Sequence, residues 1–325
     1  MDRRQGIVVR FHSNVVAVED ALTQKRFLCS LRGRFKAQNI RPIIGDVVEY
    51  IRFQDTSAVN IAGAVNMAGA EVMPTGRIEN IFPRRNVLDR PNIANIDQVL
   101  LITTLNYPEV SSFIVDRFLV LAERSGFEVC LVINKIDLLG PEGRELLERY
   151  SRYYSKDYTV IPVSARTGEG IPEVSSVLSG KISALAGMSG VGKSSVLNQI
   201  DPSLRLKEGE ISKQLEVGKH TTTYSELLPV ANKGLVADTP GFANLSLTHI
   251  PSEELKFCFP EFVRVGSQCY YEDCLHIEEP GCRVREQMDG EEILLSRYEN
   301  YLRMYRELTG LERMNPTKKY RKEKR

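Results

Sequence analysis

Hydrophobic positions in the first part of the chain gather in short, β-rich runs. Up to about residue 80, β-rich runs such as 6–10 and 46–51 are separated by Gly, Asn and Pro turn signals, and no long helical stripe occurs. This pattern predicts a small β-barrel.

From residue 95 to about 247 the pattern changes to strands that alternate with helices. The apolar runs 97–103, 128–134 and 181–186 predict strands, and 112–125 predicts a helix between the first two. Such alternation is typical of a parallel α/β sheet.

The C-terminal part is expected to be mainly helical, with one helix from about residue 252 and another over 291–308. In the second helix, apolar and aromatic residues recur at helical spacing: Leu294, Tyr298, Tyr301, Leu302, Tyr305 and Leu308. We interpret this stripe as a packed face and not as a ligand site. Together the three patterns predict three domains at 1–80, 81–247 and 248–325.

Composition narrows the class of protein. The chain has 325 residues with 42% apolar content and a formal net charge of +1. No apolar run reaches the roughly 18 residues of a membrane span, and residues 1–19 lack the apolar core of a signal peptide. We therefore expect a cytoplasmic protein with no membrane partner, in which any nucleic-acid affinity comes from local basic patches.

A phosphate-binding loop is the strongest single motif. It follows the apolar run 182–186 and precedes a short helix over 195–199, which is the strand, loop and helix context that such a site requires. Its residues, with Ser195 at the start of the helix, are Gly187, Met188, Ser189, Gly190, Val191, Gly192, Lys193 and Ser194. Backbone N–H groups there can surround phosphate oxygens, Lys193 can reach the β and γ phosphates, and Ser194 can bind magnesium.

A second motif, Asp-Thr-Pro-Gly, begins at Asp238 after the apolar run 235–237. Its carboxylate can hold the magnesium ion, usually through water, and the Gly241 N–H is expected to face the γ-phosphate.

Guanine selectivity is predicted by Asn134, Lys135 and Asp137 of the Asn-Lys-Ile-Asp motif, which follows a buried strand. The Asp137 carboxylate accepts two hydrogen bonds and so matches the paired N–H donors of guanine, which adenine lacks. We expect Asn134 to brace the loop and the Lys135 stem to cover the ring. The backbone of Ser164 and Ala165 should meet the guanine O6 atom. These residues predict GTP and GDP as ligands.

The order of the motifs is unusual, because the guanine motifs precede the phosphate loop. In most GTPases the phosphate loop opens the domain and the base-reading elements close it. The order in this chain predicts a circularly permuted GTPase.

The stretch 218–223 between the phosphate loop and Asp238 is the expected switch. Of its three threonine hydroxyls, we favour Thr222 as a magnesium ligand when the γ-phosphate is present. Phe242 follows Gly241 and cannot orient a water molecule. His220 is the nearest candidate for that role, although a surface or partner-contacting histidine remains an alternative reading.

Cysteines fall into two groups. Cys29, Cys130 and Cys258 are scattered and are expected to be small buried residues. Four soft ligands lie within 14 residues in the spacing C-x4-C-x-H-x5-C, and they are Cys269, Cys274, His276 and Cys282. Four ligands complete a tetrahedral shell, so we expect one structural zinc ion.

Basic residues are concentrated at both ends of the chain. Residues 1–56 hold ten Lys or Arg against six Asp or Glu, and 318–325 hold six basic residues in eight. A basic barrel and tail suit contacts to an RNA backbone, although such a tail is often only a solvated end.

The motif order, the switch Gly-Lys-His-Thr-Thr-Thr, the Asp-Thr-Pro-Gly-Phe turn and the Cys/His cluster together resemble the ribosome small-subunit-dependent GTPase family RsgA, also called YjeQ. The likeness covers nearly the whole chain. It implies an N-terminal OB-fold, a permuted GTPase domain and a C-terminal zinc domain.

In function, the resemblance implies a monomeric late assembly factor that binds the small ribosomal subunit and its rRNA, is stimulated by it to hydrolyse GTP, and then leaves. Two other classes stay open: an RNA-binding module that holds nucleotide only as a structural ligand, and a GTPase that acts on a different partner.

Overall fold

The structure is a computed structural model that describes residues 3–12, 15–33, 35, 40–53, 75–89, 92–206, 226–230, 232–238, 246–288, 290 and 292–314. Among these residues no helix is both long and apolar enough to cross a membrane.

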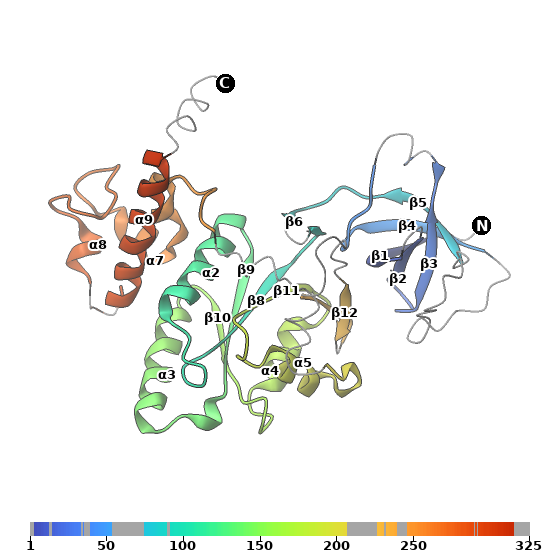
Figure 1. The fold of residues 1–325 in the computed structure, drawn as a ribbon, viewed down its shortest axis with the longest axis horizontal. Helices are drawn as coiled ribbons and strands as arrows, with labels where there is room; N and C mark the ends of the chain where they lie inside the picture. Colours follow the sequence, from blue (N-terminus) through green and yellow to red (C-terminus); the bar gives the residue numbers. More distant parts are fainter. Residues whose placement is uncertain are drawn as a thin grey trace, which may run out of the picture. The chain divides into compact units, whose positions relative to one another are not determined.

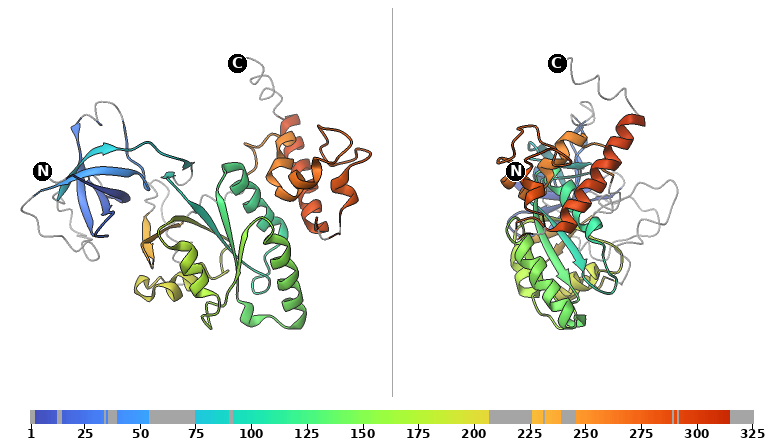
Figure 2. Two further views of the ribbon diagram at one scale, coloured as in Figure 1. Left: turned by 180° about the vertical axis from the view of Figure 1, so that it is seen from behind. Right: turned by 90° about the vertical axis from the view of Figure 1, so that its left-hand side faces the viewer.

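Five strands near the N-terminus close into a barrel, as the short β-rich runs predicted (Figure 1). They are β1 (Arg3–His12), β2 (Val15–Asp20), β3 (Arg26–Leu31), β4 (Val47–Arg52) and β5 (Gly76–Ile81). The order around the barrel is β1-β2-β3-β5-β4. Only the β3 and β5 pair is parallel; the other neighbours run antiparallel. Figure 2 shows these strands in blue to cyan from two further sides.

The barrel interior is filled by apolar side chains from alternate strand positions, as the two-residue period requires. Its core consists of Val8, Val16, Val18, Phe27, Cys29, Phe35, Val48, Tyr50 and Ile78. Tyr50 places its hydroxyl 2.5 Å from Asp20 and donates a hydrogen bond to that carboxylate. The buried Tyr50 hydroxyl thereby has a hydrogen-bond partner. After the barrel, β6 (Val87–Asp89) and β7 (Asn92–Ala94) form an antiparallel pair.

The central sheet has the strand order β10-β9-β8-β11-β13-β12. Its strands are β8 (Gln98–Thr104), β9 (Glu128–Asn134), β10 (Thr159–Pro162), β11 (Ile182–Ala186), β12 (Leu227–Val230) and β13 (Gly234–Asp238). β10 runs parallel to β9 and β11 runs parallel to β13, whereas β12 is antiparallel to β13. The predicted α/β sheet with parallel strands is confirmed, with an antiparallel strand added at one edge.

Helices follow the strands of this sheet in turn (Figure 1). They are α2 (Ser112–Ser125), α3 (Pro141–Tyr154), α4 (Ile171–Leu178) and α5 (Lys193–Ile200), with 3₁₀ turns at Ile136–Leu138 and Pro202–Leu204. The helix predicted over 112–125 is confirmed at both ends. Gly126 ends it in the left-handed conformation, with φ at 70°, which glycine adopts at no steric cost.

The C-terminal part differs from the prediction at its first helix. A 3₁₀ helix covers Ser252–Cys258 and α7 begins only at Pro260 (Pro260–Gly266). Phe259 between them is extended, with φ at −121° and ψ at 96°, because a residue before proline is excluded from the helical region. The remaining helices are α8 (Arg283–Glu286) and α9 (Leu295–Met314).

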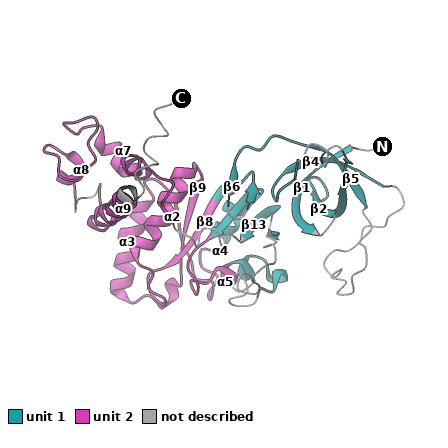
Figure 3. Ribbon diagram, turned by 45° about the horizontal axis from the view of Figure 1, so that its top comes forward, with its two compact units in different colours: residues 1–98, 172–185, 197–241 teal, residues 99–171, 186–196, 242–325 magenta. Residues whose placement is uncertain are grey.

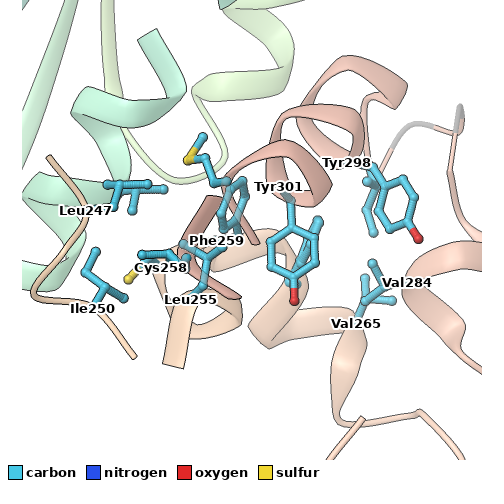
Figure 4. Close-up of a cluster of buried hydrophobic side chains, with 14 of the residues drawn as sticks. Leu247, Ile250, Leu255, Cys258, Phe259, Val265, Val284, Tyr298 and Tyr301 are labelled. Atoms are coloured by element: carbon cyan, nitrogen blue, oxygen red, sulfur yellow. The ribbon is translucent and has the colours of Figure 1, made fainter. Parts of the chain in front are cut away.

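One apolar cluster holds this C-terminal part together (Figure 4). Tyr298 and Tyr301 of α9 are buried in it with Phe259, Phe262 and Val284. Leu302 and Tyr305 are half-buried against the same cluster, so the aromatic stripe of this helix does pack inward. Cys29, Cys130 and Cys258 are buried, as expected for small core residues.

A buried ionic network joins α9 to α2 and α7. Arg297 has no exposed surface; it donates to both Glu261 oxygens at 2.7 and 3.1 Å and to Asp116 at 2.9 Å. Asn300 donates to the other Asp116 oxygen at 2.6 Å, and Tyr153 donates to Glu261 at 3.0 Å. Burial raises the pKa of Asp116. Burial also acts to raise the pKa of Glu261, but the charge and bidentate hydrogen bonds of Arg297, with the hydrogen bond from Tyr153, lower it overall.

The chain divides into two compact units that each draw on distant segments (Figure 3). Unit 1 comprises residues 1–98, 172–185 and 197–241, and unit 2 comprises 99–171, 186–196 and 242–325. The guanine motifs and the phosphate loop both belong to unit 2.

Candidate nucleotide-binding site and metal centre

The phosphate loop connects β11 to α5, and the lysine that begins the helix folds back onto it. Lys193 donates from Nζ to the carbonyl oxygens of Gly187 and Met188, both at 2.9 Å. Ser194, in the first helical turn, is 6% exposed. The ammonium group and the helix N-terminus thus border the same loop, an arrangement that binds phosphate groups.

Two glycines of this loop could not carry a side chain. Gly187 has φ at 137°, and a Cβ there would lie 2.2 Å from the carbonyl oxygen of Ile102. Gly192 has φ at 95°, and its Cβ would lie 2.4 Å from Nδ2 of Asn134. Glycine is required at both places, since it allows left-handed backbone and close approach of neighbouring segments. At Gly192 the approaching neighbour is the guanine motif.

Asn134, the last residue of β9, links the motifs that the sequence analysis had identified separately. Its Nδ2 donates to the Val191 carbonyl oxygen at 2.8 Å, and its Oδ1 accepts from the Ala165 N–H at 3.1 Å. The side chain is 3% exposed, so both polar ends are satisfied inside the protein. One amide therefore holds the phosphate loop, the guanine loop and the Ser-Ala segment together.

Lys135 connects the guanine loop to two further backbone segments. It is in the left-handed conformation, with φ at 66°, and its Nζ donates to the carbonyl oxygens of Tyr107 and Gly190, both at 2.7 Å. Tyr107 lies in the loop after β8 and was not predicted as part of the site. Its only sequence signal is its position after a parallel strand, at the edge where such sheets bind ligands.

The Asp137 carboxylate is held by neighbours on both oxygens. Ser164 donates from Oγ to Oδ1 at 2.7 Å, and the Arg166 guanidinium lies 3.8 Å from Oδ2. The Thr167 N–H donates in turn to the Ser164 hydroxyl at 3.1 Å. Sequence reasoning assigned only a backbone role to Ser164 and missed Arg166. Arg166 follows the Ser-Ala pair directly, and its side chain is 80% exposed.

The remaining site residues are only partly described. Asp238 is the last residue of β13, and its backbone is in register with Leu185 of β11, the strand that leads into the phosphate loop. Its side chain lies outside the described residues, as do His220, Thr222 and Gly241 in full.

Cys269, Cys274, His276 and Cys282 converge on one point, with all four ligand atoms within 4.8 Å of one another. The Sγ atoms of Cys269 and Cys282 lie 3.6 and 3.5 Å from Nδ1 of His276. In a tetrahedral zinc site, sulfur and nitrogen ligands are separated by roughly 3.6 Å, given Zn–S and Zn–N bonds of about 2.3 and 2.0–2.1 Å. The donor set and its spacing fit zinc.

Burial keeps the side chains of this cluster neutral in the absence of a metal ion. Burial, with a contribution from Lys256, lowers the pKa of His276 to about 4, so the imidazole is neutral and can act as a ligand near pH 7. Burial raises the pKa of Cys274 to about 12, so a thiolate is stable here only beside a positive charge such as a metal ion.

Glu279 and two tyrosines fix the ligand loop. The Glu279 carboxylate accepts from the N–H groups of Leu275, Ile277 and Glu278 at 2.7, 2.8 and 3.0 Å. Tyr298 donates to the His276 carbonyl oxygen at 2.9 Å and Tyr301 to that of Leu275 at 2.5 Å. None of these supporting contacts was predicted. The two tyrosine contacts join residues 22 and 26 positions apart, so they depend on the folded chain.

Comparison with known proteins places this geometry in a family. A family model described as RsgA GTPase matches residues 81–248. A protein from Thermotoga neapolitana named "Small ribosomal subunit biogenesis GTPase RsgA" is 47% identical over 308 residues, which cover 95% of this chain and 98% of that protein. A protein of the same name from Carboxydothermus hydrogenoformans is 41% identical over 311 residues, which cover 95% and 99%.

Two solved structures are similar over nearly their full length. The crystal structure of YjeQ from Thermotoga maritima matches with a TM-score of 0.78 and 44% identity, covering 95% of this chain and 99% of that one. The crystal structure of YloQ, described as a circularly permuted GTPase, matches with a TM-score of 0.75 and 30% identity, covering 95% and 96%.

Proposed function

The chain belongs to the RsgA GTPase family, and from that membership we propose that it hydrolyses GTP as a maturation factor of the small ribosomal subunit. The observation that carries the proposal is the pair of hydrogen bonds from Asn134, which join a guanine-reading loop to a phosphate loop. A phosphate loop joined in this way to a loop that carries Asp137 suits a guanine nucleotide. The relatives' names supply the ribosomal subunit as partner.

Within the site, Asp137 reads the base, Lys135 covers it, and the backbone of Ser164 and Ala165 meets the O6 atom. Ser164 supports the Asp137 role, because its hydroxyl donates to Oδ1 and orients that oxygen. The exposed Arg166 guanidinium adds only a loose ion pair, 3.8 Å from Oδ2. The loop from Gly187 to Ser195 holds the phosphates. Lys193 supplies positive charge to the β and γ phosphates.

Magnesium would be held by Ser194, Thr222 and Asp238, and it supplies charge neutralisation to the phosphates when bound. The Gly241 N–H faces the γ-phosphate. Phe242 offers no group that could orient water, so His220 is proposed for that task. These switch roles rest on the sequence motifs alone.

Zinc is proposed as one structural ion per chain at Cys269, Cys274, His276 and Cys282. Four protein ligands leave no open position for a substrate, so the ion would stabilise the fold and take no part in hydrolysis.

RNA contact is assigned to the barrel and to the basic tail 318–325. Several barrel arginines are already paired with carboxylates, among them Arg3 with Glu49, Arg26 with Glu19 and Arg32 with Glu79. The contribution of the barrel to phosphate binding should therefore be smaller than its ten basic residues suggest. We also propose a cytoplasmic location, since small ribosomal subunits are the proposed partner. The proposed domains are 1–80, 81–247 and 248–325, and the proposed oligomeric state is a monomer.

Co-sedimentation with purified ribosomal subunits tests the proposed partner. The chain should pellet with small subunits in the presence of a nonhydrolysable GTP analogue, less with GDP, and not with large subunits. Binding that ignores both the nucleotide and the subunit would instead favour an RNA-binding module in which nucleotide is only a structural ligand.

A further inference from the structure

The loop that carries the proposed zinc ligands displays two aromatic side chains to solvent. Tyr270 and Tyr271 directly follow Cys269, and they are 79% and 42% exposed. Aromatic residues of the C-terminal apolar cluster are buried by contrast, among them Phe259, Phe262, Tyr298 and Tyr301. An exposed pair of large aromatic side chains is informative, because such apolar surface is stabilised when a partner covers it.

The two rings are held in a fixed arrangement. Their centroids lie 4.9 Å apart with an interplanar angle of 83°, which is an edge-to-face contact. The Tyr270 N–H donates to the Gly281 carbonyl oxygen at 3.1 Å, and the Cys274 N–H donates to the Tyr271 carbonyl oxygen at 3.3 Å. A partner that binds here would order little of the protein, which lowers the entropy cost of binding.

The charge around this pair is negative. Residues 267–282 contain no Lys or Arg and four acidic residues, Glu272, Asp273, Glu278 and Glu279. Glu279 is occupied by the three backbone N–H groups of the ligand loop. The other three acidic residues are exposed, and none of them forms an ion pair with another residue that the structure describes.

Cations close to this loop do not reverse its charge. Lys256 donates from Nζ to the Cys274 carbonyl oxygen at 3.0 Å and lies 5.1 Å from the centroid of the Phe257 ring. Arg283 of α8 pairs with Glu286 at 2.6 Å. Arg285, the other arginine of α8, can offset one of the three exposed carboxylates. The surface therefore repels a phosphate backbone and attracts Lys and Arg side chains.

We propose that the surface formed by Tyr270, Tyr271, Glu272 and Asp273 docks a Lys- or Arg-rich segment of a partner protein. The ring faces take an ammonium or guanidinium group by cation–π contact, and the two carboxylates pair with neighbouring cations of the segment. RNA bases also stack on exposed aromatic rings, but RNA brings a phosphate with each base, which these carboxylates disfavour. That the segment lies on the small ribosomal subunit rests on the proposed function, whereas the affinity for a basic peptide does not.

A fluorescently labelled peptide of alternating Lys and Arg tests this chemistry without ribosomes, by anisotropy titration with the full-length chain. Glu272→Lys combined with Asp273→Lys should weaken binding by about tenfold or more, because two attractive contacts become repulsive. Tyr270→Ala should weaken binding about threefold, the usual effect of an exposed cation–π contact. Tyr270→Phe keeps the ring and should bind nearly as the wild type does.

Co-sedimentation with purified small subunits, in the presence of a nonhydrolysable GTP analogue, separates a basic protein segment from RNA. The Glu272→Lys, Asp273→Lys variant should bind small subunits less tightly than the wild type if the partner segment is basic protein. A surface for RNA gives the opposite sign, since two added lysines strengthen contacts to phosphates.

Glu145→Lys combined with Glu148→Lys is the matched control, because it makes the same charge change on exposed residues of α3. It should leave the affinities for the peptide and for small subunits unchanged. Zinc content and unfolding temperature check the fold of each variant, and the Tyr270→Ala and Tyr270→Phe pair decides the question if the charge-reversed loop does not fold.

The docking surface is rejected if the Glu272→Lys, Asp273→Lys variant binds the peptide as the wild type does, or if the α3 control loses as much peptide affinity. It is also rejected if charge reversal in the loop leaves binding to small subunits unchanged or makes it tighter. A wild type that binds the peptide at this loop but does not bind small subunits would support the docking surface and contradict the proposed function.

Discussion

Asp137 is the residue on which guanine selectivity should depend. Its Oδ1 accepts a hydrogen bond from Ser164, which orients the carboxylate, and the Arg166 guanidinium lies 3.8 Å from Oδ2. Asp137→Asn replaces one acceptor by a donor, which opposes the guanine N–H pair and suits the carbonyl of xanthine. GTP affinity should fall by about 100-fold or more, as hydrogen bonds to a charged group are worth about 1.5–3 kcal/mol each, and xanthosine triphosphate should bind better. Competition titrations with both nucleotides measure the change.

Ser164→Ala is the control for that experiment. It removes the hydroxyl that donates to Asp137 but leaves the carboxylate that reads the base. GTP binding should weaken by about tenfold or less, the usual worth of one hydrogen bond, with no gain for xanthosine triphosphate. Wild-type GTP affinity in Asp137→Asn would show that the base is read elsewhere.

At the level of single residues, sequence reasoning identified the groups but not their contacts. Asn134, Lys135 and Asp137 form a short motif whose chemistry is local and readable. Tyr107 and Arg166 were missed. Arg166 lies outside the motifs, directly after Ala165. Tyr107 contacts Lys135 through a backbone carbonyl that any residue could offer. Contacts made by the backbone leave no trace in residue type.

Among the helices, α9 depends most on one buried charge. Arg297 is fully buried between Asp116 of α2 and Glu261 of α7. Arg297→Met would leave two buried carboxylates without their cation. The free energy of unfolding should fall by about 3–5 kcal/mol, measured by urea denaturation followed by circular dichroism.

Arg124→Met provides the comparison, since Arg124 also joins α2 to the C-terminal part, through Glu254, but is 44% exposed. Exposed pairs contribute about 0–1 kcal/mol, so this variant should unfold almost as the wild type does. Equal losses in both variants would mean that burial of Arg297 has no special effect.

The Cys269–Cys282 loop is the element whose fold should depend on metal. Chelation, or the change Cys274→Ser, should remove the zinc and lower the unfolding temperature of the C-terminal part, because metal binding contributes to folding in small metal domains. Metal analysis of the purified wild type should give one zinc per chain. A full equivalent of tightly bound zinc in Cys274→Ser would reject the assigned ligands.

Elements with strong periodicity were predicted well, and the errors have local causes. Helix α2 and the parallel strands follow from apolar runs bounded by turn residues. The helix expected from residue 252 is instead a 3₁₀ segment, and α7 starts after the break at Phe259, because Pro260 excludes helical backbone at the residue before it. The Arg297 network could not be predicted, since its members are separated by up to 184 residues.

For the whole molecule, motif order predicted the permuted topology, and the similarity to YloQ and YjeQ confirms it. What the order could not reveal is how the permuted domain connects to its neighbours. The C-terminal part packs on α2 through a buried network, and Glu226 at the edge of the sheet is held by the barrel. Both attachments depend on side chains that meet only in the folded chain.

GTP turnover by the full-length chain, measured alone and with purified small or large ribosomal subunits, tests the central claim most directly. Hydrolysis should be slow alone, because Phe242 cannot orient water, and small subunits should accelerate it strongly; completion of a GTPase site by a partner reaches about 10⁵-fold in another system. Lys193→Ala should remove the activity in every mixture and so exclude contaminating GTPases. A wild-type rate that small subunits leave unchanged, or that large subunits raise equally, would contradict a small-subunit-dependent GTPase.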